Sequence, residues 1–288
     1  MAEGQGNYSV TILGAGVMGT GIATLTVGHG IPVVLVDVSD EKLDRARQVI
    51  ASQLRHSHLM SALPVDCQPG ELTTSMSLRD AADASAVIEA VTEAPELKAK
   101  VLAEVSAVVR PGTPVISNTS GIPIDEMAEW VTRGDELIGT HFMNPPYLIK
   151  MVEVIRGSRT GESTMTAVTA LLASLGRQAI VVRDAPGFVT SRLLHPMINR
   201  AAQVIAEGTA TVEAVDALME GCLGHPTGPL RTADLIGLDN LADSLEVLFQ
   251  RTGDESCRPC ALLVEKVREG NLGRKTGRGF YDYGKTPL

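Results

Sequence analysis

The stretch YSVTILGAGVMGTGIA, residues 8–23, decides the fold of this chain. An apolar, β-branched run leads directly into a GxGxxG glycine pattern, and helical residues follow to about Gly30. The first glycine permits a tight turn, the second lets backbone N–H groups approach a pyrophosphate, and the third lets the helix pack on the strand. The order strand, glycine turn, helix predicts a dinucleotide-binding α/β domain. The expected cofactor contacts are Gly14, Gly16, Val17, Met18 and Gly19.

The next apolar run, IPVVLVD, ends in Asp37. An acid at this place accepts hydrogen bonds from the adenosine ribose hydroxyls, and its charge repels a 2′-phosphate. Val38 and Ser39 follow it and supply no arginine to compensate. We therefore predict NAD rather than NADP as the cofactor. A glycine turn in some other α/β fold is the alternative that the pattern leaves open.

Strand-like and helical segments continue to alternate as far as residue 182. The pattern predicts strands at 87–91, 114–118, 137–141, 152–155 and 178–182, and helices at 95–109, 124–130 and 163–175. Such alternation is typical of a doubly wound, mainly parallel sheet. The segment 41–71 is longer than a simple crossover, and we expect it to form a projecting helical hairpin.

The predicted secondary structure changes after the tetrapeptide DAPG, residues 184–187. Strand-like runs stop, and helical periodicity appears near 188–207, 211–221, 230–250 and 259–269. A domain boundary near residue 186 follows. We expect a Rossmann-type α/β domain over residues 1–186 and a smaller all-helical domain over residues 187–288.

The segment GTHFMNPPYLIKMVEVI, residues 139–155, carries the strongest catalytic signal. A strand ends near His141, and a turn follows at Asn144, Pro145 and Pro146. The β-branched run after this turn contains Glu153. If the two strands are neighbours in one sheet, the carboxylate can meet the imidazole. A carboxylate that orients a histidine and stabilises its protonated form makes that histidine a general base near neutral pH. A satisfied core histidine beside an edge-strand glutamate is the alternative interpretation.

Composition sets bounds on the class of protein. Of 288 residues, 44% are hydrophobic and 20% are charged, which is a globular composition. The formal net charge is −9 and no basic run occurs, so we expect neither a nucleic acid nor a membrane surface as partner. No run of eighteen apolar residues and no signal-peptide pattern at the N-terminus is present, so we expect a cytoplasmic protein. The four cysteines form no ligand set, and no metal site is predicted.

Several motifs together resemble the 3-hydroxyacyl-CoA dehydrogenase family, including its 3-hydroxybutyryl-CoA dehydrogenase members. The resemblance spans nearly the whole chain and rests on LGAGVMGTGIA, EAVTEAPELKAKV, SNTSGIPI, HFMNP with VEVI, DAPGFVTSRLL, HPTGPLRTADLIGLD and GRKTGRGFYDY. It implies a Rossmann-type domain, a helical C-terminal domain through which the protein forms a homodimer, and an active site in a cleft between the two. The implied reaction is the NAD-dependent oxidation of the 3-hydroxyl of a short 3-hydroxyacyl thioester, or its reverse.

The resemblance also assigns roles to residues. His141 matches the family's catalytic base, Glu153 its orienting partner and Ser120 the serine that hydrogen-bonds the reacting oxygen, with Asn144 as a further donor. The positions that match contacts near the nicotinamide ribose and neighbouring groups are Glu93, Lys98, Asn118, Ser120, Asn144 and Lys275. Alternatively, the two lysines are ordinary solvated side chains, and the serine caps the helix that follows Ile122.

Two places depart from the family's pattern. The chain has Ser191 before Arg192 where the family has asparagine, and residues 53–60, QLRHSHLM, carry one permanent positive charge where fatty-acid-oxidising members carry a lysine-rich run. We therefore expect weaker binding of a CoA nucleotide. The alternative substrate is a hydroxyacyl or glyceryl group on an acyl carrier protein, as in polyketide extender-unit pathways. Tyr147 and Ser191 are the residues expected near the acyl group.

Two other functions compete with this one. Dehydrogenases of free hydroxy acids share the plan but use a lysine of the helical domain, and no lysine lies between Lys150 and Lys266 here. A non-catalytic NAD-binding protein would keep the fold without the chemistry. The intact pair of His141 and Glu153, together with Ser120, argues against it.

Overall fold

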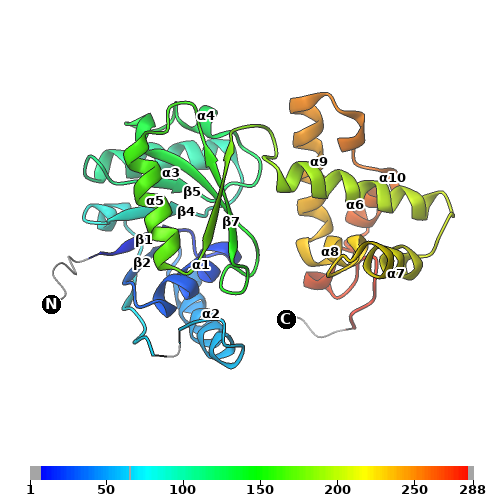
Figure 1. Ribbon diagram of the computed structural model, residues 1–288, viewed down its shortest axis with the longest axis horizontal. Coiled ribbons are helices and arrows are strands. Elements are labelled where there is room, and N and C mark those ends of the chain that lie inside the picture. The colour runs from blue at the N-terminus through cyan, green and yellow to red at the C-terminus, as the bar shows by residue number, and fades with distance from the viewer. Residues whose placement is uncertain (1–7, 65, 285–288) are drawn as a thin grey trace. The chain divides into compact units, whose positions relative to one another are not determined.

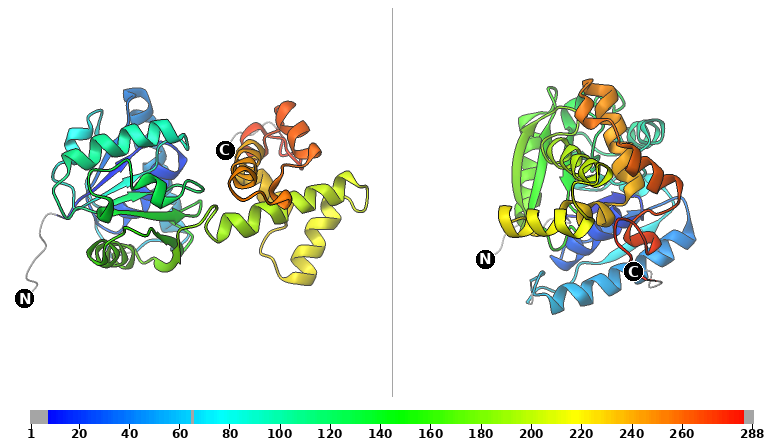
Figure 2. Two further views of the ribbon diagram at one scale, coloured as in Figure 1. Left: turned by 90° about the horizontal axis from the view of Figure 1, so that it is seen from above. Right: turned by 90° about the vertical axis from the view of Figure 1, so that its right-hand side faces the viewer.

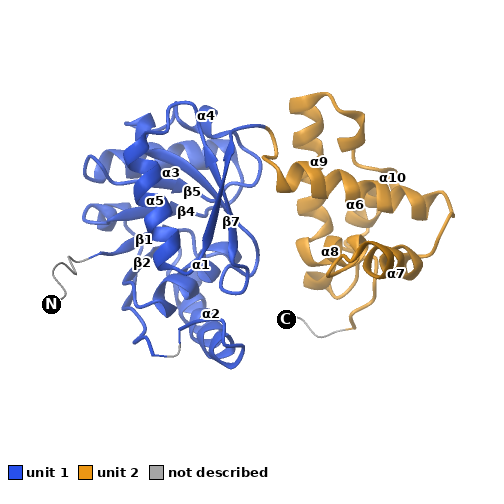
Figure 3. Ribbon diagram, viewed as in Figure 1, with its two compact units in different colours: residues 1–185 blue, residues 186–288 orange. Residues whose placement is uncertain are grey.

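The computed structural model describes residues 8–64 and 66–284 (Figure 1). The chain divides into two compact units, residues Met1–Ala185 and Pro186–Leu288 (Figure 3). Residues 1–7, which belong to the N-terminal stretch without a signal-peptide pattern, lie outside the described residues. Among the helices that the structure describes, none is long and apolar enough to cross a membrane.

The first unit is built on one eight-stranded sheet in the order β3-β2-β1-β4-β5-β6-β7-β8. The strands are β1 (Val10–Leu13), β2 (Val33–Val36), β3 (Leu72–Ser75), β4 (Ala86–Glu89), β5 (Val115–Ser117), β6 (Leu137–Phe142), β7 (Met151–Arg156) and β8 (Gln178–Arg183). All neighbouring strands are parallel except β6 and β7, which are antiparallel. The short apolar runs form central strands because a parallel sheet covered on both faces buries every side chain. The prediction of a doubly wound, mainly parallel sheet is confirmed.

Helices cover both faces of this sheet. The α-helices of the unit are α1 (Val17–Gly28), α2 (Asp40–Leu59), α3 (Pro95–Val108), α4 (Ile124–Met127) and α5 (Glu162–Ser174). Buried residues of α1, α2 and α5 share one hydrophobic core with the strands, and Figure 2 shows α3 on the side of the sheet opposite α5. The carboxyl ends of β1, β2, β4, β5 and β6 meet at one edge of the sheet, and the glycine loop, Asp37, Ser120 and His141 lie at this edge.

The predicted helical hairpin over 41–71 is wrong. The segment holds a single helix, α2, whose N-cap Ser39 accepts a hydrogen bond from the backbone N–H of Lys42 at 3.3 Å. The described part of the return, residues 60–71 without residue 65, contains no helix and leads into β3. That strand escaped the sequence pattern because its four residues, LTTS, are mostly polar and lie at the edge of the sheet, where no second neighbour buries them.

The second unit is helical. Its α-helices are α6 (Thr190–Ala206), α7 (Val212–Leu223), α8 (Pro229–Ile236), α9 (Leu238–Thr252) and α10 (Ala261–Arg268). The single helix predicted over 230–250 is two helices, since Gly237 has a φ of +96° and ends α8 before α9 begins. A common apolar core joins these helices to Phe280 and Tyr281 of the C-terminal segment.

Candidate active site

The antiparallel pairing of β6 and β7 places His141 directly opposite Glu153. The imidazole Nδ1 and the carboxylate Oε2 are 3.1 Å apart, and the two side chains are only 11% and 6% exposed. Directly opposite residues of an antiparallel pair project to the same face, which explains the contact. The expected meeting of imidazole and carboxylate therefore exists in the structure. Its low dielectric surroundings strengthen the interaction and leave the carboxylate able to stabilise an imidazolium.

The connection between these two strands carries Asn144 and Tyr147. Asn144 is exposed, whereas Tyr147 is 7% exposed and belongs to the main hydrophobic core, and its burial raises the pKa of the phenol. The backbone oxygen of Tyr147 accepts a hydrogen bond from Arg177 Nη2 at 3.0 Å. The structure thus places Tyr147 in the core, and its predicted position near the acyl group stays a prediction.

The glycine loop has the geometry that a pyrophosphate requires. Gly14 has a φ of +102°, and a Cβ there would lie 2.6 Å from the backbone oxygen of Ala90. A Cβ on Gly19 would lie 1.8 Å from the backbone oxygen of Gly14, so only glycine fits at either position. Gly16 is the N-cap of α1, supplies no side-chain cap and borders open space. The first N–H groups of α1 are therefore available to an anion, which the helix dipole also favours.

Asp37 follows β2 at the same edge of the sheet. Its Oδ2 accepts a hydrogen bond from the backbone N–H of Ala15 at 2.9 Å, so the carboxylate also braces the glycine loop. Its Oδ1 is buried and accepts no hydrogen bond within the described structure, with the ammonium of Lys42 at 3.8 Å. An orphaned buried acceptor costs free energy unless a ligand satisfies it. A ribose hydroxyl of NAD would do so, and the residues present fit that cofactor.

Ser120 lies in the loop between β5 and α4, and Glu93 holds this loop. Oε1 of Glu93 accepts hydrogen bonds from Thr119 Oγ1 at 2.5 Å, from the Ser120 backbone N–H at 2.9 Å and from the Gly121 backbone N–H at 3.2 Å. Burial favours a raised pKa for Glu93, but the charge of Lys98 and these hydrogen bonds outweigh it and lower the pKa below its usual value. Glu93 is therefore an anion at neutral pH.

The predicted alternatives for Ser120 and Lys98 are both wrong. Ser120 does not cap α4, whose N-cap is Pro123, and the hydroxyl of Thr119 accepts the local backbone hydrogen bond from Ile122 at 3.0 Å. Lys98 is not a solvated lysine, since its side chain is 1% exposed. The lysine is instead a structural cation of the site.

Lys98 leads to a residue that the sequence analysis missed. Its Nζ lies 2.6 Å from Oε1 of Glu89 and 3.1 Å from Oε2 of Glu93. Glu89 is fully buried at the end of β4, inside the run VIEAV. A charged side chain within an apolar strand was the signal that could have found it, because such a charge needs a buried partner.

Asn118 connects the loop to the catalytic strand. Its side-chain Oδ1 accepts a hydrogen bond from the backbone N–H of Phe142 at 3.1 Å, and Phe142 follows His141 in β6. Residues 117–120 thus join β5 to the strand that carries the imidazole.

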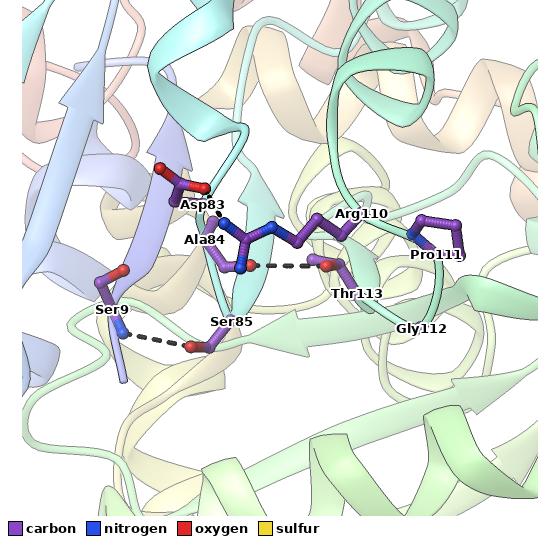
Figure 4. A pocket seen from close by; sticks show the side chains of 8 residues that line it. All are labelled: Ser9, Asp83, Ala84, Ser85, Arg110, Pro111, Gly112 and Thr113. Atoms are coloured by element: carbon purple, nitrogen blue, oxygen red, sulfur yellow. Dashed lines mark hydrogen bonds and ion pairs between the residues drawn. The ribbon is translucent and has the colours of Figure 1, made fainter. Parts of the chain in front are cut away.

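A cavity of about 660 Å³ opens elsewhere in this unit, beside the amino ends of β4 and β5 (Figure 4). Arg110 and Asp83 pair across it, and Thr113 Oγ1 donates to the backbone oxygen of Ala84 at 3.4 Å. Ligands of doubly wound sheets bind beyond the carboxyl ends of the strands. We assign this cavity no part in the chemistry of His141.

The family model described as "3-hydroxyacyl-CoA dehydrogenase, NAD binding domain" matches residues 9–185, and the model of the C-terminal domain of the same enzymes matches residues 187–283. The chain belongs to the 3-hydroxyacyl-CoA dehydrogenase family. Its N-terminal unit is therefore an NAD-binding domain, which agrees with the fit of Asp37 and the glycine loop. The resemblance read from the motifs is confirmed.

Relatives align over nearly the full length of the chain. The 3-hydroxybutyryl-CoA dehydrogenase of Bradyrhizobium diazoefficiens is 42% identical over 277 residues, which are 95% of this chain and 94% of that protein. A probable 3-hydroxybutyryl-CoA dehydrogenase of Deinococcus radiodurans is 41% identical over 274 residues, 94% of this chain and 99% of that protein. The crystal structure of (S)-3-hydroxybutyryl-CoA dehydrogenase from Ralstonia eutropha aligns with a TM-score of 0.87 at 40% identity, covering 96% of this chain and 99% of that chain.

Two positions assigned by the family pattern lie in the helical unit. Ser191, in the first turn of α6, is 3% exposed. Lys275 is 44% exposed and its Nζ pairs with Asp239 Oδ2 at 2.5 Å. Burial favours a raised pKa for Asp239, but the hydrogen bond from Lys275 outweighs it and lowers that pKa. Lys275 therefore has a fixed carboxylate partner within its own unit.

The cysteines of the described residues form neither a disulfide nor part of a metal site. All four cysteines are free thiols; Cys257 and Cys260 of the CxxC pair are buried, and burial raises the pKa of both. Across the described residues, no group of three His, Cys, Asp or Glu side chains is placed to hold a metal ion.

Proposed function

We propose that this protein oxidises the 3-hydroxyl of a short 3-hydroxyacyl-CoA, of the 3-hydroxybutyryl type, to the 3-oxo form with NAD, and catalyses the reverse reduction. The observation that carries the proposal is the buried contact between His141 and Glu153 at the carboxyl edge of an NAD-binding sheet. The relatives at about 41% identity are named for this reaction, which supports the same substrate class.

The chemistry requires a base that faces the carbon which loses its hydride. His141 takes the proton of the 3-hydroxyl through Nε2, since Nδ1 faces Glu153 at 3.1 Å. Glu153 stabilises the imidazolium that results and keeps the ring in one orientation. NAD, when bound, accepts the hydride. In the reverse direction His141 returns the proton to the oxygen of the ketone.

Ser120 and Asn144 are the proposed donors to the substrate oxygen. Charge develops on that oxygen as its proton leaves, and a preorganised donor stabilises it. The loop that carries Ser120 is fixed by Glu93, which supports such preorganisation. Replacing a donor of this kind typically lowers kcat by about a hundredfold.

The deciding experiment compares two substrates of equal acyl group. We expect turnover of 3-hydroxybutyryl-CoA with NAD, and much slower turnover of the same acyl group on an acyl carrier protein. The relatives are named for CoA substrates, so the carrier-protein alternative from the lysine-poor segment 53–60 is not favoured. Absence of turnover with both substrates, while His141 is intact, would contradict the proposal.

Two wider assignments accompany this function. A homodimer formed through the C-terminal helices is supported by apolar side chains that lie exposed on the isolated helical unit, among them Leu193, Leu218 and Leu223. A cytoplasmic location suits an enzyme of acyl-CoA metabolism.

A further inference from the structure

Glu89 is a buried carboxylate that the proposed chemistry does not use. It is the last residue of β4 and is 0% exposed. Its Oε1 accepts hydrogen bonds from Lys98 Nζ at 2.6 Å and from the backbone N–H of Val91 at 2.8 Å, and its Oε2 accepts one from Ser117 Oγ at 2.6 Å. A buried charge is strongly unfavourable unless it is paired and hydrogen-bonded, so this position is constrained by its partners.

Lys98 connects Glu89 to the surface of the site. Its ammonium, on α3, lies between the two carboxylates, 2.6 Å from Glu89 and 3.1 Å from Glu93. Two carboxylates and one ammonium leave a net negative charge. Because Glu89 is fully buried and the side chain of Glu93 is 39% exposed, the negative charge that solvent and ligands meet is that of Glu93.

Glu93 contacts both Lys98 and the loop that carries Ser120. While one carboxylate oxygen faces Lys98, the other accepts the backbone N–H groups of Ser120 and Gly121 and the hydroxyl of Thr119. An anion held by a fixed cation on one side can order a loop on the other. The position of the Ser120 hydroxyl therefore depends on where Lys98 holds Glu93.

Two further hydrogen bonds connect the start of this loop to β4 and to β6, the strand that carries His141. Ser117, which precedes it, donates to Glu89, and Asn118 accepts from the backbone of Phe142 beside His141. Glu89 therefore takes part in both sets of contacts that position Ser120 relative to the imidazole. It accepts a hydrogen bond from Ser117, and it contacts Lys98, which in turn contacts Glu93.

We propose that Glu89 is a positioning residue of this enzyme: through Lys98 and Glu93 it fixes the loop that presents Ser120 to the substrate and to the nicotinamide half of the cofactor. The role rests on the proposed function, since it presumes that Ser120 binds the reacting oxygen. Glu89 itself is fully buried, so the proposal gives it no direct contact with substrate or cofactor.

The competing explanation is a buried ion pair that contributes only to the stability of the fold. The chain offers a matched control in Glu136, which is 7% exposed, pairs with Arg133 Nε at 2.6 Å and accepts the backbone N–H of Gly112 at 2.6 Å. Glu136 directly precedes β6, at the amino end of that strand and far along it from His141.

The test exchanges the buried pair as a unit, Glu89→Gln with Lys98→Met, because Lys98→Met alone would leave the charge of Glu89 buried and unpaired. The exchange is made in the full chain and again in a Ser120→Ala background, and kcat is measured with 3-hydroxybutyryl-CoA and NAD on protein whose circular dichroism shows a folded state. We expect kcat to fall by about 10-fold to 100-fold with Ser120 present, as for a small misplacement of a reacting group. With Ser120 already removed, the same exchange should lower kcat by less than about threefold, because the two changes act on one element.

Glu136→Gln should lower the Tm and leave kcat of the folded enzyme within about twofold, since its ion pair is independent of the loop. Equal losses of kcat from the Glu89 and Lys98 exchange in both backgrounds, or no loss in either, would overturn the positioning role. If the unmodified protein does not turn over 3-hydroxybutyryl-CoA, the proposed function has failed, and NADH binding followed by fluorescence then decides the role of Glu89. In that case an increase of about tenfold in the Kd of NADH supports it and an unchanged Kd overturns it.

Discussion

Among single residues, His141 and Glu153 matter most for the proposed chemistry, because His141 Nδ1 contacts Glu153 Oε2 at 3.1 Å. Both side chains are largely buried, and they are directly opposite each other in the antiparallel pair of β6 and β7. A carboxylate on Nδ1 sets both the tautomer and the direction of the ring, so that proton transfer goes through Nε2. In the proposed mechanism the two side chains therefore act together.

His141→Ala should lower kcat by about a hundredfold or more, because a positioned general base contributes a factor of this size. Steady-state kinetics with 3-hydroxybutyryl-CoA measure the loss, and NADH fluorescence checks that cofactor binding survives. Glu153→Gln keeps a neutral partner for the ring and should lie between the alanine variant and the unmodified protein. Activity near that of the unmodified protein in His141→Ala would remove this residue from the mechanism.

Asp37 governs the second prediction at this scale. Asp37→Asn keeps an acceptor for the backbone N–H of Ala15 but removes the charge that repels a 2′-phosphate. The ammonium of Lys42, 3.8 Å from Oδ1, is then available to that phosphate. We expect the preference of kcat/KM for NAD over NADP to fall by about tenfold, a typical effect of one charged hydrogen bond.

The control for Asp37 is the same change with Lys42→Ala added. The double variant should recover most of the preference of kcat/KM for NAD over NADP, because it lacks the Lys42 ammonium that attracts the 2′-phosphate. If Asp37→Asn leaves the cofactor preference unchanged, the residue does not select the cofactor.

At the scale of elements, the helical unit depends on two buried aspartates. Asp216 of α7 is 1% exposed and accepts the backbone N–H groups of Leu230 and Arg231 at 2.8 and 2.9 Å, at the start of α8. It also accepts the hydroxyl of Tyr281 at 2.8 Å. Asp234 of α8 likewise accepts the backbone N–H groups of Phe280 and Tyr281. The C-terminal segment is therefore fastened to α7 and α8.

Asp216→Ala should reduce the free energy of unfolding by about 3 kcal/mol, because it leaves buried N–H groups without their charged acceptor. Urea unfolding followed by circular dichroism measures the change. Asp243→Ala on the exposed face of α9 is the control and should change it by less than about 0.5 kcal/mol. A loss at Asp216 no larger than at Asp243 would contradict the fastening role.

Tyr281 gives the same segment a pH dependence. Burial, and then the hydrogen bond to Asp216 and the repulsion from its charge, raise the pKa of Tyr281 to about 12 from 10.0. Its contribution to stability is complete below pH 10.0 and is lost as the pH rises through about 12, because the unfolded chain releases the proton first. Urea unfolding at about pH 9 and about pH 11 should show a smaller decline for Tyr281→Phe than for the unmodified protein. Parallel declines would refute the assignment.

The elements also show which local patterns suffice for prediction. Runs such as VTIL and VVLV form strands as expected, because a buried parallel strand is apolar along its whole length. The edge strand LTTS was missed because it lies at the sheet's edge and its polar residues mimic a loop. The break between α8 and α9 was missed because an isolated glycine in an amphipathic pattern carries little weight until its positive φ is seen.

At the scale of the whole molecule, the proposed homodimer is open to direct test. Sedimentation velocity should give a dimer at micromolar concentration, since large apolar side chains such as Leu218 and Leu223 lie exposed on the isolated unit. Leu218→Glu with Leu223→Glu should shift the protein to monomer if α7 is part of the contact. A dimer that withstands both changes would place the interface on other helices.

The sequence alone determined the class of fold and the cofactor, and it predicted that His141 could meet Glu153 if their strands were neighbours. Each depends on signals between elements that are consecutive in the chain: a glycine pattern after a strand, an acid after the next strand, and two strands joined by one connection. The pairing of Glu89 with Lys98 and the burial of Tyr147 were visible only in the tertiary structure. The partners of a buried charge or ring come from elements far apart in the chain, and no local pattern records which of them meet.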